Sequence, residues 1–173
     1  SFSYVVGSNK LLLQMVIDGP LPGASDTTTY NYNSTGDLTS VVNAYGHTTT
    51  QSNFDFNGRA QSVVDPTGIL TSISYDGRGR IKAMTRNGAT TTLSYTPLGQ
   101  VSTRSTIPSS STQIYTYNGI GRLIQARDTQ DNYERYEYDK LGNITKLTKL
   151  KGTVIQFVSE SDYDEAGRRV ASR

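Results

Sequence analysis

One pattern recurs along this chain and leaves few folds open to it: an aromatic residue followed four positions later by glycine. Seven copies occur, and successive aromatics are separated by 22, 21, 20, 22, 21 and 25 residues. The copies are Tyr32–Gly36, Phe54–Gly58, Tyr75–Gly79, Tyr95–Gly99, Tyr117–Gly121, Tyr138–Gly142 and Tyr163–Gly167. A period of about 22 residues is typical of a repeat array in which each unit packs on its neighbours.

Each copy predicts a β-hairpin. Apolar residues alternate before the motif aromatic, as at Ile73 and Tyr75, and a period of two indicates a strand with one buried face. Asp or Asn follows the aromatic in every copy except at Thr96. The Asp/Asn-x-x-Gly element indicates a turn, because the short polar side chain accepts backbone N–H groups and glycine tolerates positive φ. Apolar residues recur at two and five positions after the glycine, and in a regular strand these two positions would lie on opposite faces. Either a β-bulge or burial of both faces would explain this pattern.

We therefore predict an all-β fold, an antiparallel meander of hairpin repeats that forms a curved or spiral sheet. About eight units would give roughly sixteen strands, and twisted sheets of that width curl or close. No helix is expected, since Gly or Pro interrupts every helical pattern. The open strand edges at the two ends of such an array are templates for pairing. Either the chain is part of a longer sheet, or its ends pair with a partner, for which self-association is one option.

The predicted array covers residues 25–173 and holds about seven copies. Residues 1–24 form a lead-in segment in which residues 4–11 resemble a decayed copy. Two Pro and two Gly fall within residues 18–23, which predicts a loop at the boundary.

Composition excludes several classes of function. The chain has 17 basic and 15 acidic residues, a net charge of +2 that gives no overall attraction to nucleic acid. It has no Cys, which excludes disulfides, thiolate metal sites and thiol nucleophiles. Its longest aliphatic run is Leu11–Leu13, too short for a membrane span. The start at Ser1 without Met favours an excised or processed piece.

No catalytic, cofactor-binding or metal-binding residue is predicted, so we do not expect an enzyme. The single histidine, His47, flanks a turn at Tyr45-Gly46. Three charged groups have a surface interpretation and a functional one: an acidic group as a weak cation site, a lysine group as a basic patch, and the arginines after the motif glycines as a ligand-binding ridge. These groups are Glu160, Asp162, Asp164 and Glu165; Lys146, Lys149 and Lys151; and Arg59, Arg80, Arg122 and Arg168. The surface interpretation is favoured for the acids and lysines, while the arginines are expected to bond turn carbonyls or to stack on tyrosine.

The repeat resembles the YD repeat of Rhs proteins, with Tyr75-Asp-Gly-Arg-Gly-Arg-Ile81 and Tyr138-Asp-Lys-Leu-Gly-Asn-Ile144 as the closest matches. The resemblance covers about residues 28–170. Phe54 in place of Tyr and Thr96-Pro97 in the fourth copy depart from the pattern. Asp65-Pro-Thr-Gly68 shares four letters with the element that cleaves off the toxin in bacterial families. Ala60 stands where that longer motif has Pro, so we interpret the segment as an ordinary turn.

The resemblance implies a structural function. In bacterial Rhs effectors and in the C component of Tc toxins, such repeats build a β-sheet shell around a variable C-terminal toxin. The implied partners are the remaining repeats of the parent protein and an enclosed toxin, and the implied location is secreted or exported from a bacterium. Related repeats in teneurins serve cell-surface adhesion, so the alternative is an adhesive or carbohydrate-binding array. A compact cluster of exposed tyrosines that binds glycans would favour that alternative.

Overall fold

The computed structural model describes residues 1–21 and 26–173, and within these ranges every regular element is a β-strand. The chain divides into two compact units, residues 1–89 and 90–173. The strands of the first unit are β1 (Phe2–Val6), β2 (Leu12–Ile17), β3 (Thr28–Tyr32), β4 (Leu38–Val42), β5 (Thr48–Phe54), β6 (Ala60–Val64), β7 (Leu70–Tyr75) and β8 (Ile81–Arg86). The predicted all-β fold without helices is confirmed.

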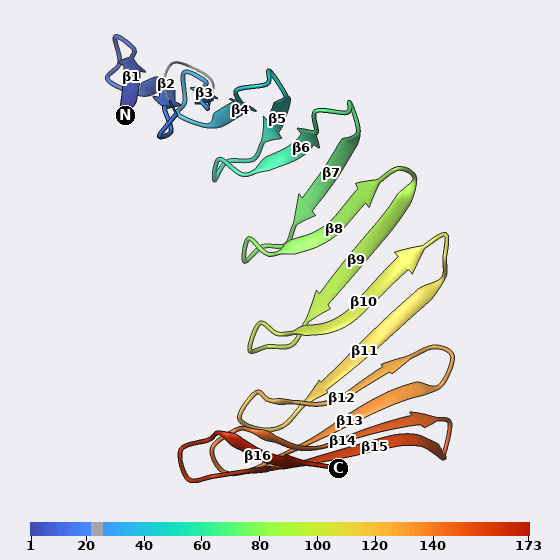
Figure 1. The fold of residues 1–173 in the computed structure, drawn as a ribbon. Coiled ribbons are helices and arrows are strands. Elements are labelled where there is room, and N and C mark those ends of the chain that lie inside the picture. The colour runs from blue at the N-terminus through green and yellow to red at the C-terminus, as the bar shows by residue number, and fades with distance from the viewer. Residues whose placement is uncertain (22–25) are drawn as a thin grey trace. The chain divides into compact units, whose positions relative to one another are not determined.

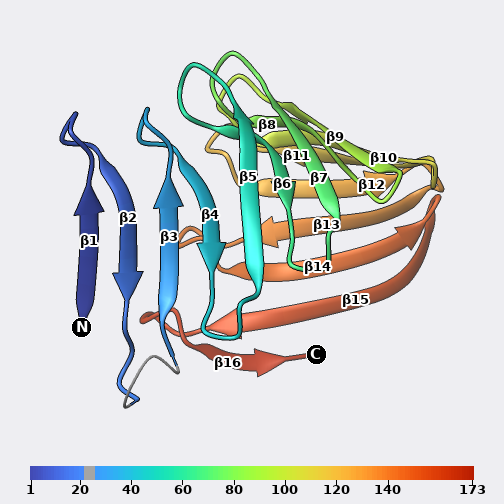
Figure 2. The ribbon, with the colours of Figure 1, turned by 90° about the horizontal axis from the view of Figure 1, so that it is seen from above.

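The second unit contains the remaining strands, of which β9 begins at the residue that closes the first unit. They are β9 (Ala89–Tyr95), β10 (Val101–Ile107), β11 (Ser111–Tyr117), β12 (Leu123–Asp128), β13 (Asn132–Tyr138), β14 (Ile144–Lys151), β15 (Val154–Tyr163) and β16 (Arg169–Ser172). Within each unit every strand pairs antiparallel with the strands next to it in the chain. Figure 2 shows β1 to β5 side by side in alternating directions, and the predicted meander is confirmed.

The strands alternate between two kinds of turn. The turn that contains the motif glycine joins the strands of one repeat, and a second turn leads to the next repeat. In the second unit the repeat turns lie along one edge of the sheet and the connecting turns along the opposite edge (Figure 1). Side chains of consecutive repeat turns can therefore meet.

A β-bulge follows nearly every repeat turn. It explains why the apolar residues two and five positions after the motif glycine can lie on one face of the sheet, a question that the sequence left open. In the third repeat Tyr75 pairs with Ile81 and Ser74 pairs with Ala83, so Lys82 is the extra residue. The bulge places the residues two and five positions after the glycine on the same face as the motif aromatic. We call this face the aromatic face.

Very few side chains are buried among the described residues. Only Ala60 and Leu150 are buried among the hydrophobic residues, at 9% and 8% exposure, and no side chain is fully buried. The strands of each unit contact only their neighbours in the chain. Each repeat is therefore stabilised by the adjacent repeats, as in other quasi-one-dimensional arrays.

The lead-in segment begins with a hairpin. β1 pairs with β2, and β2 pairs with β3 through contacts such as Met15 opposite Tyr30. The Asn9 Nδ2 donates to the carbonyl of Ser34 at 3.1 Å, which joins the lead-in turn to the first repeat turn. The predicted boundary after residue 24, together with Pro22 and Gly23 of the predicted loop, lies outside the described residues.

Candidate functional site: the ladder of repeat turns

The carboxylate of each repeat turn closes the turn on itself. In the third repeat the Asp76 Oδ1 accepts the backbone N–H groups of Arg78 and Arg80, both at 2.9 Å. The Asp76 Oδ2 accepts the guanidinium of Arg80 at 2.6 Å. This is an Asx turn, in which a short side chain takes the place of a backbone acceptor. Asp55 with Arg59 and Asp164 with Arg168 repeat the same ion pair.

These bonds favour the ionised form of the aspartate. The side-chain bond from Arg80 and then its backbone N–H lower the pKa of Asp76 to about 2. The bonds of Arg59 lower the pKa of Asp55, and those of Asn143 lower the pKa of Asp139. Hydrogen bonds to the charged form are the physical cause in each case.

The motif glycine ends the turn in a conformation that other residues adopt rarely. Gly36, Gly58, Gly79, Gly99, Gly121, Gly142 and Gly167 all have positive φ, between 72° and 99°. Each donates its N–H to the carbonyl of the residue after the motif aromatic, as Gly79 does to Asp76 at 2.9 Å. The absence of a Cβ removes the steric cost of this backbone region.

The motif tyrosine joins its repeat to the preceding one through a hydrogen bond. Its hydroxyl donates to the carbonyl of the residue two positions after the preceding motif glycine. The pairs are Tyr75 to Ala60 (3.0 Å), Tyr117 to Val101 (2.8 Å), Tyr138 to Leu123 (2.7 Å) and Tyr163 to Ile144 (3.0 Å). Phe54 has no hydroxyl, so the second repeat cannot make this bond to the first.

In several repeats the residue after the motif glycine reaches forward to the next repeat, as Arg59, Gln100 and Arg122 do. The Gln100 Nε2 donates to the Gly121 carbonyl at 2.5 Å, and the Arg122 Nη1 donates to the Asp139 carbonyl at 2.9 Å. The Arg59 guanidinium carbon lies 4.6 Å from the centre of the Tyr75 ring, and that of Arg122 lies 5.6 Å from the Tyr138 ring. Backward tyrosine bonds and forward side chains together form what we call the turn ladder.

Removing the hydroxyl from Tyr138 will test the ladder. We expect Tyr138→Phe to lower the free energy of unfolding by about 1 kcal/mol, because the Leu123 carbonyl loses its partner. The reverse change, Phe54→Tyr, places a hydroxyl beside the first repeat and is expected to raise stability by up to about 1 kcal/mol. Urea denaturation of both variants measures the two effects, and equal midpoints for wild type and both variants would contradict the assigned role of the hydroxyl.

The connecting turns use the same chemistry at the other edge. The Asp65 Oδ1 accepts the N–H groups of Thr67 (2.9 Å) and Ile69 (3.1 Å), and its Oδ2 accepts the guanidinium of Arg86 at 2.5 Å. Bonds from Thr67 and from the Ile69 backbone N–H hold the pKa of Asp65 well below its ordinary value. Asp65-Pro-Thr-Gly68 thus has the hydrogen bonds of a turn.

The single histidine lies in another connecting turn. The His47 N–H donates to Asn43 Oδ1 at 3.0 Å, and the ring Nδ1 lies 3.3 Å from Asn43 Nδ2. His47 is exposed. No nucleophile or acid is placed against its ring in the contacts of the described residues.

The acidic and lysine groups that the sequence singled out are largely joined to opposite charges. Glu160 pairs with Lys146 (3.1 Å) and with Arg173 (3.1 Å), which also pairs with Asp162 (3.2 Å). Lys149 pairs with Glu134 at 2.8 Å. The Lys151 ammonium donates to the Gln130 carbonyl. Across residues 1–21 and 26–173 no group of His, Asp and Glu side chains could hold a metal ion.

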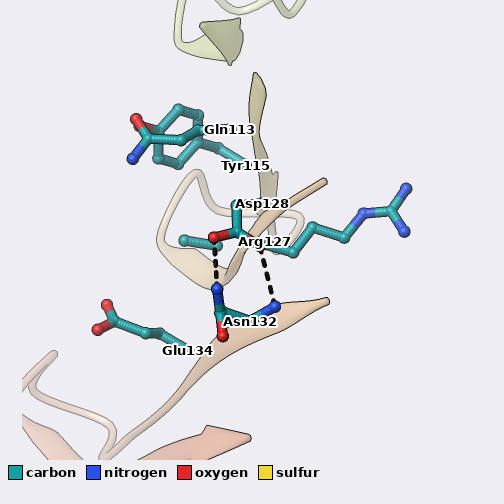
Figure 3. Close-up of a pocket in the computed structure, with 7 residues that line it drawn as sticks. Gln113, Tyr115, Arg127, Asp128, Asn132 and Glu134 are labelled. Atoms are coloured by element: carbon teal, nitrogen blue, oxygen red, sulfur yellow. Dashed lines mark hydrogen bonds between the residues drawn. The ribbon is translucent and has the colours of Figure 1, made fainter. Parts of the chain in front are cut away.

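A small hollow interrupts the aromatic face over β11 to β13 (Figure 3). It has a volume of about 220 Å³, and Gln113, Tyr115, Ala126 and Glu134 are among the residues that line it. The Tyr115 hydroxyl donates to Gln113 Oε1 at 2.9 Å, and the Tyr136 hydroxyl donates to Glu134 Oε2 at 2.6 Å. Burial and the bond to Glu134 raise the pKa of Tyr136 to about 12.

The hollow exists because one column of the repeat changes size. The residues five positions after the motif glycine are Val41, Val63, Met84, Arg104, Ala126 and Leu147 in the first six repeats. Ala126 is the smallest of them, and the sequence interpretation did not single it out, although aligning the copies would have found it. Amide and carboxylate groups beside a tyrosine ring suit a hydroxyl-rich ligand, but the volume is below the 300–1,000 Å³ of most ligand sites. Carbohydrate binding therefore stays a prediction.

No described segment is a helix long and apolar enough to cross a membrane.

Comparisons with known proteins identify the family of this chain and solved structures with a similar fold. The sequence profile of the family described as teneurin YD-shell matches residues 8–171. No curated protein sequence matches the chain. The crystal structure of TcdB2-TccC3-Cdc42 is similar with a TM-score of 0.64 and 18% identity, and the match covers 92% of this chain and 9% of that one. The structure of TcdB2-TccC3 without its hypervariable C-terminal region gives a TM-score of 0.55 and 16% identity, over 95% of this chain and 12% of that one.

The chain thus spans about a tenth of the length of these two relatives. The family match covers nearly all of the seven repeats whose turns form the ladder. This chain belongs to the teneurin YD-shell family.

Proposed function

We propose that residues 1–173 are a segment of the wall of a YD-repeat shell. The shell would enclose a C-terminal toxin of the same protein before delivery, and the protein would be exported from a bacterium. The turn ladder is the observation that carries this proposal, because it joins successive repeats within each unit through side chains as well as through strand pairing.

The ladder suits a wall because it can be extended without a central core. The strands of each unit contact only their neighbours in the chain, and in the part of the chain that the structure describes only two hydrophobic residues are buried. Stability in such an array comes from interfaces between successive units. Both faces of the sheet are left accessible, so one face can line a lumen while the other meets the outside.

The chemistry of the described residues favours a structural role over an enzymatic one. The two most strongly lowered carboxyl pKa values belong to Asp65 and Asp76, and each of these carboxylates accepts backbone N–H groups of its own turn. Perturbed groups at active sites usually face a cleft where a substrate can reach them. Here the perturbation stabilises turns.

Protection of the cargo from protease tests the proposal. In the full-length protein that carries this segment, we expect the C-terminal segment to resist a protease that cuts it rapidly once released by denaturant. Gly121→Val, which breaks a repeat turn, should expose the cargo, whereas Gly119→Val in the same turn should not. Cleavage of the cargo in the wild-type protein at the rate of the unfolded chain would refute enclosure.

A further inference from the structure

The turn ladder is broken at its first step. The residue after the motif glycine is a donor wherever it reaches the next turn in the contacts described above, as with Gln100 and Arg122. In the first repeat this residue is Asp37. A carboxylate cannot donate to the carbonyls of the next turn, nor can it place a cation over the next motif aromatic.

Asp37 nevertheless occupies the ladder position. Its Oδ1 lies 2.6 Å from the point where a Cβ on Gly58 would be. Its Oδ2 accepts Thr35 Oγ1 at 2.6 Å and Asn33 Nδ2 at 3.0 Å. These two bonds, from Thr35 first and Asn33 second, hold the pKa of Asp37 below its ordinary value, so the group is ionised at neutral pH. No ion pair to Asp37 occurs among residues 1–21 and 26–173.

A groove of about 500 Å³ opens beside this carboxylate. It lies between the first and second repeat turns and is lined by Thr35, Asp37, Phe54 and Phe56, among others. Phe54 is the motif aromatic of the second repeat, the position at which Tyr75 lies under Arg59 and Tyr138 under Arg122. The Phe56 side chain is fully exposed at 111%. The groove therefore combines an ionised carboxylate, a motif ring to which the described contacts assign no cation, and an apolar side chain in water.

We propose that this groove binds an arginine side chain of a partner polypeptide, whose guanidinium takes the place that the ladder elsewhere gives to its own arginines. The guanidinium would donate one bond to Asp37 Oδ1 and a parallel bond to Oδ2, which becomes available when Thr35 turns its hydroxyl to Asn33 Oδ1, 2.7 Å away. It would lie over the Phe54 ring, while its aliphatic stem covers Phe56. Planar guanidinium groups suit both bidentate carboxylate pairing and stacking on aromatic rings, whereas an ammonium group provides only a point charge.

The charge of the groove selects against other ligands. An anion would face the carboxylate of Asp37, to which no cation is paired in the described parts of the chain. An apolar ligand would bury that carboxylate without a partner, which is unfavourable. Asp55, which also borders the groove, already pairs with Arg59 at 2.6 Å, so Asp37 is the charge left for a ligand.

Titration of residues 1–173 with the peptide acetyl-Ala-Arg-Ala-amide, followed by amide NMR shifts, tests the proposal. We expect saturable shifts at Asp37, Phe54, Phe56 and Gly58. The same peptide with citrulline or lysine in place of arginine should bind at least about tenfold more weakly, because citrulline lacks the charge and lysine lacks the planar donor pair. Equal affinity for the arginine peptide and either analogue, or the absence of saturable shifts, would overturn the proposal.

Two variants separate binding from folding. Asp37→Asn should weaken binding of the arginine peptide about tenfold or more, while Asp131→Asn, in a connecting turn of the second unit, should leave it unchanged. Asp37→Arg supplies the missing ladder arginine and should abolish binding while the amide spectrum stays that of a folded chain. Unchanged binding to Asp37→Asn, or to a folded Asp37→Arg, would refute the assigned role of the carboxylate.

Discussion

Gly121→Val is expected to lower the free energy of unfolding by about 1–3 kcal/mol, because it forces a β-branched residue into positive φ. Gly121 has φ of 83°. A Cβ at this position would also meet the Gln100 Nε2 at 2.9 Å, and that amide donates to the Gly121 carbonyl. The substitution therefore strains the fifth repeat turn and displaces its ladder bond to the fourth.

The same turn contains its own control. Gly119 does not have positive φ, and a Cβ on it would meet no other atom within 4 Å. Gly119→Val should therefore change stability by less than about 0.5 kcal/mol, as most surface substitutions do. The third repeat offers a second pair: Gly79 has φ of 82° and lies against Arg59, while Gly77 lies in open space.

Urea denaturation of Gly121→Val, Gly119→Val, Gly79→Val and Gly77→Val measures the loss of stability in each variant. Hydrogen exchange shows which strands lose protection. The amides of β11 and β12 should lose protection in Gly121→Val before those of β14 and β15, because local opening follows the strained hairpin. Equal stability of Gly121→Val and Gly119→Val would contradict the assignment of the motif glycine to a backbone position that excludes side chains.

The elements of this fold could be predicted from the sequence because each is specified within a few residues. Strand alternation and the Asp-x-x-Gly turn depend on residues close together in the chain. The strand and turn at Ile73–Gly79 could therefore be predicted without knowledge of the neighbouring repeats. The regular period of the hairpins predicted that the strands follow one another in chain order.

The sequence predicted that the arginines would bond turn carbonyls or stack on tyrosine, as Arg59 and Arg122 do. The tyrosine bonds, and the repeat to which each side chain reaches, could not be predicted because they depend on register between repeats. The Tyr75 hydroxyl meets the Ala60 carbonyl, fifteen residues away, because the connecting turn between β6 and β7 sets the register of these strands, with Ser62 opposite Ser72 and Val64 opposite Leu70. Nothing in a single copy indicates that its tyrosine bonds backward or that its arginine reaches forward. A sequence pattern shows which residues recur, whereas the contacts of repeated residues come from the way the units stack.

Positions at which one copy differs from the other copies indicated possible binding sites, but the search for recurring residues did not single them out. Ala126 stands at a position that holds larger residues in the other copies among the first six, and Asp37 stands at a position that holds arginine in four of the other six copies. In the structure a hollow lies beside Ala126 and a groove lies beside Asp37. Both depend on how the neighbouring strands are placed. Exceptions in a repeat array are therefore candidates for sites, because the regular positions are occupied by the contacts that hold the array together.

Acid is expected to unfold this chain between about pH 4 and pH 2. The unfolded aspartates titrate near 3.9, while the contacts in the turn lower the folded pKa of Asp76 to about 2. A depressed folded pKa means that the stabilisation is complete above the unfolded pKa and is lost as the pH falls through the folded pKa. The carboxylates of Asp55, Asp139 and Asp164 have lowered pKa values for the same reason, so several repeats lose stability in the same range.

Thermal melting measures the effect. The melting temperature should be nearly constant from pH 7 to pH 5 and fall steadily below pH 4. High salt should weaken the ion pairs between arginine and aspartate but leave the backbone bonds to the carboxylate in place.

Asp76→Asn isolates the charge from the turn. Asparagine keeps an oxygen that accepts the N–H groups of Arg78 and Arg80, as Asn118 does for Ile120 and Arg122 in the fifth repeat, but it does not titrate. The variant should melt at a lower temperature than wild type at pH 7 and depend less on pH below 4. Glu137→Gln, which removes an exposed carboxylate on β13 outside the repeat turns, should keep the wild-type dependence. If Asp76→Asn and wild type lost stability in parallel on acidification, the turn carboxylates would not be the groups whose protonation opens the array.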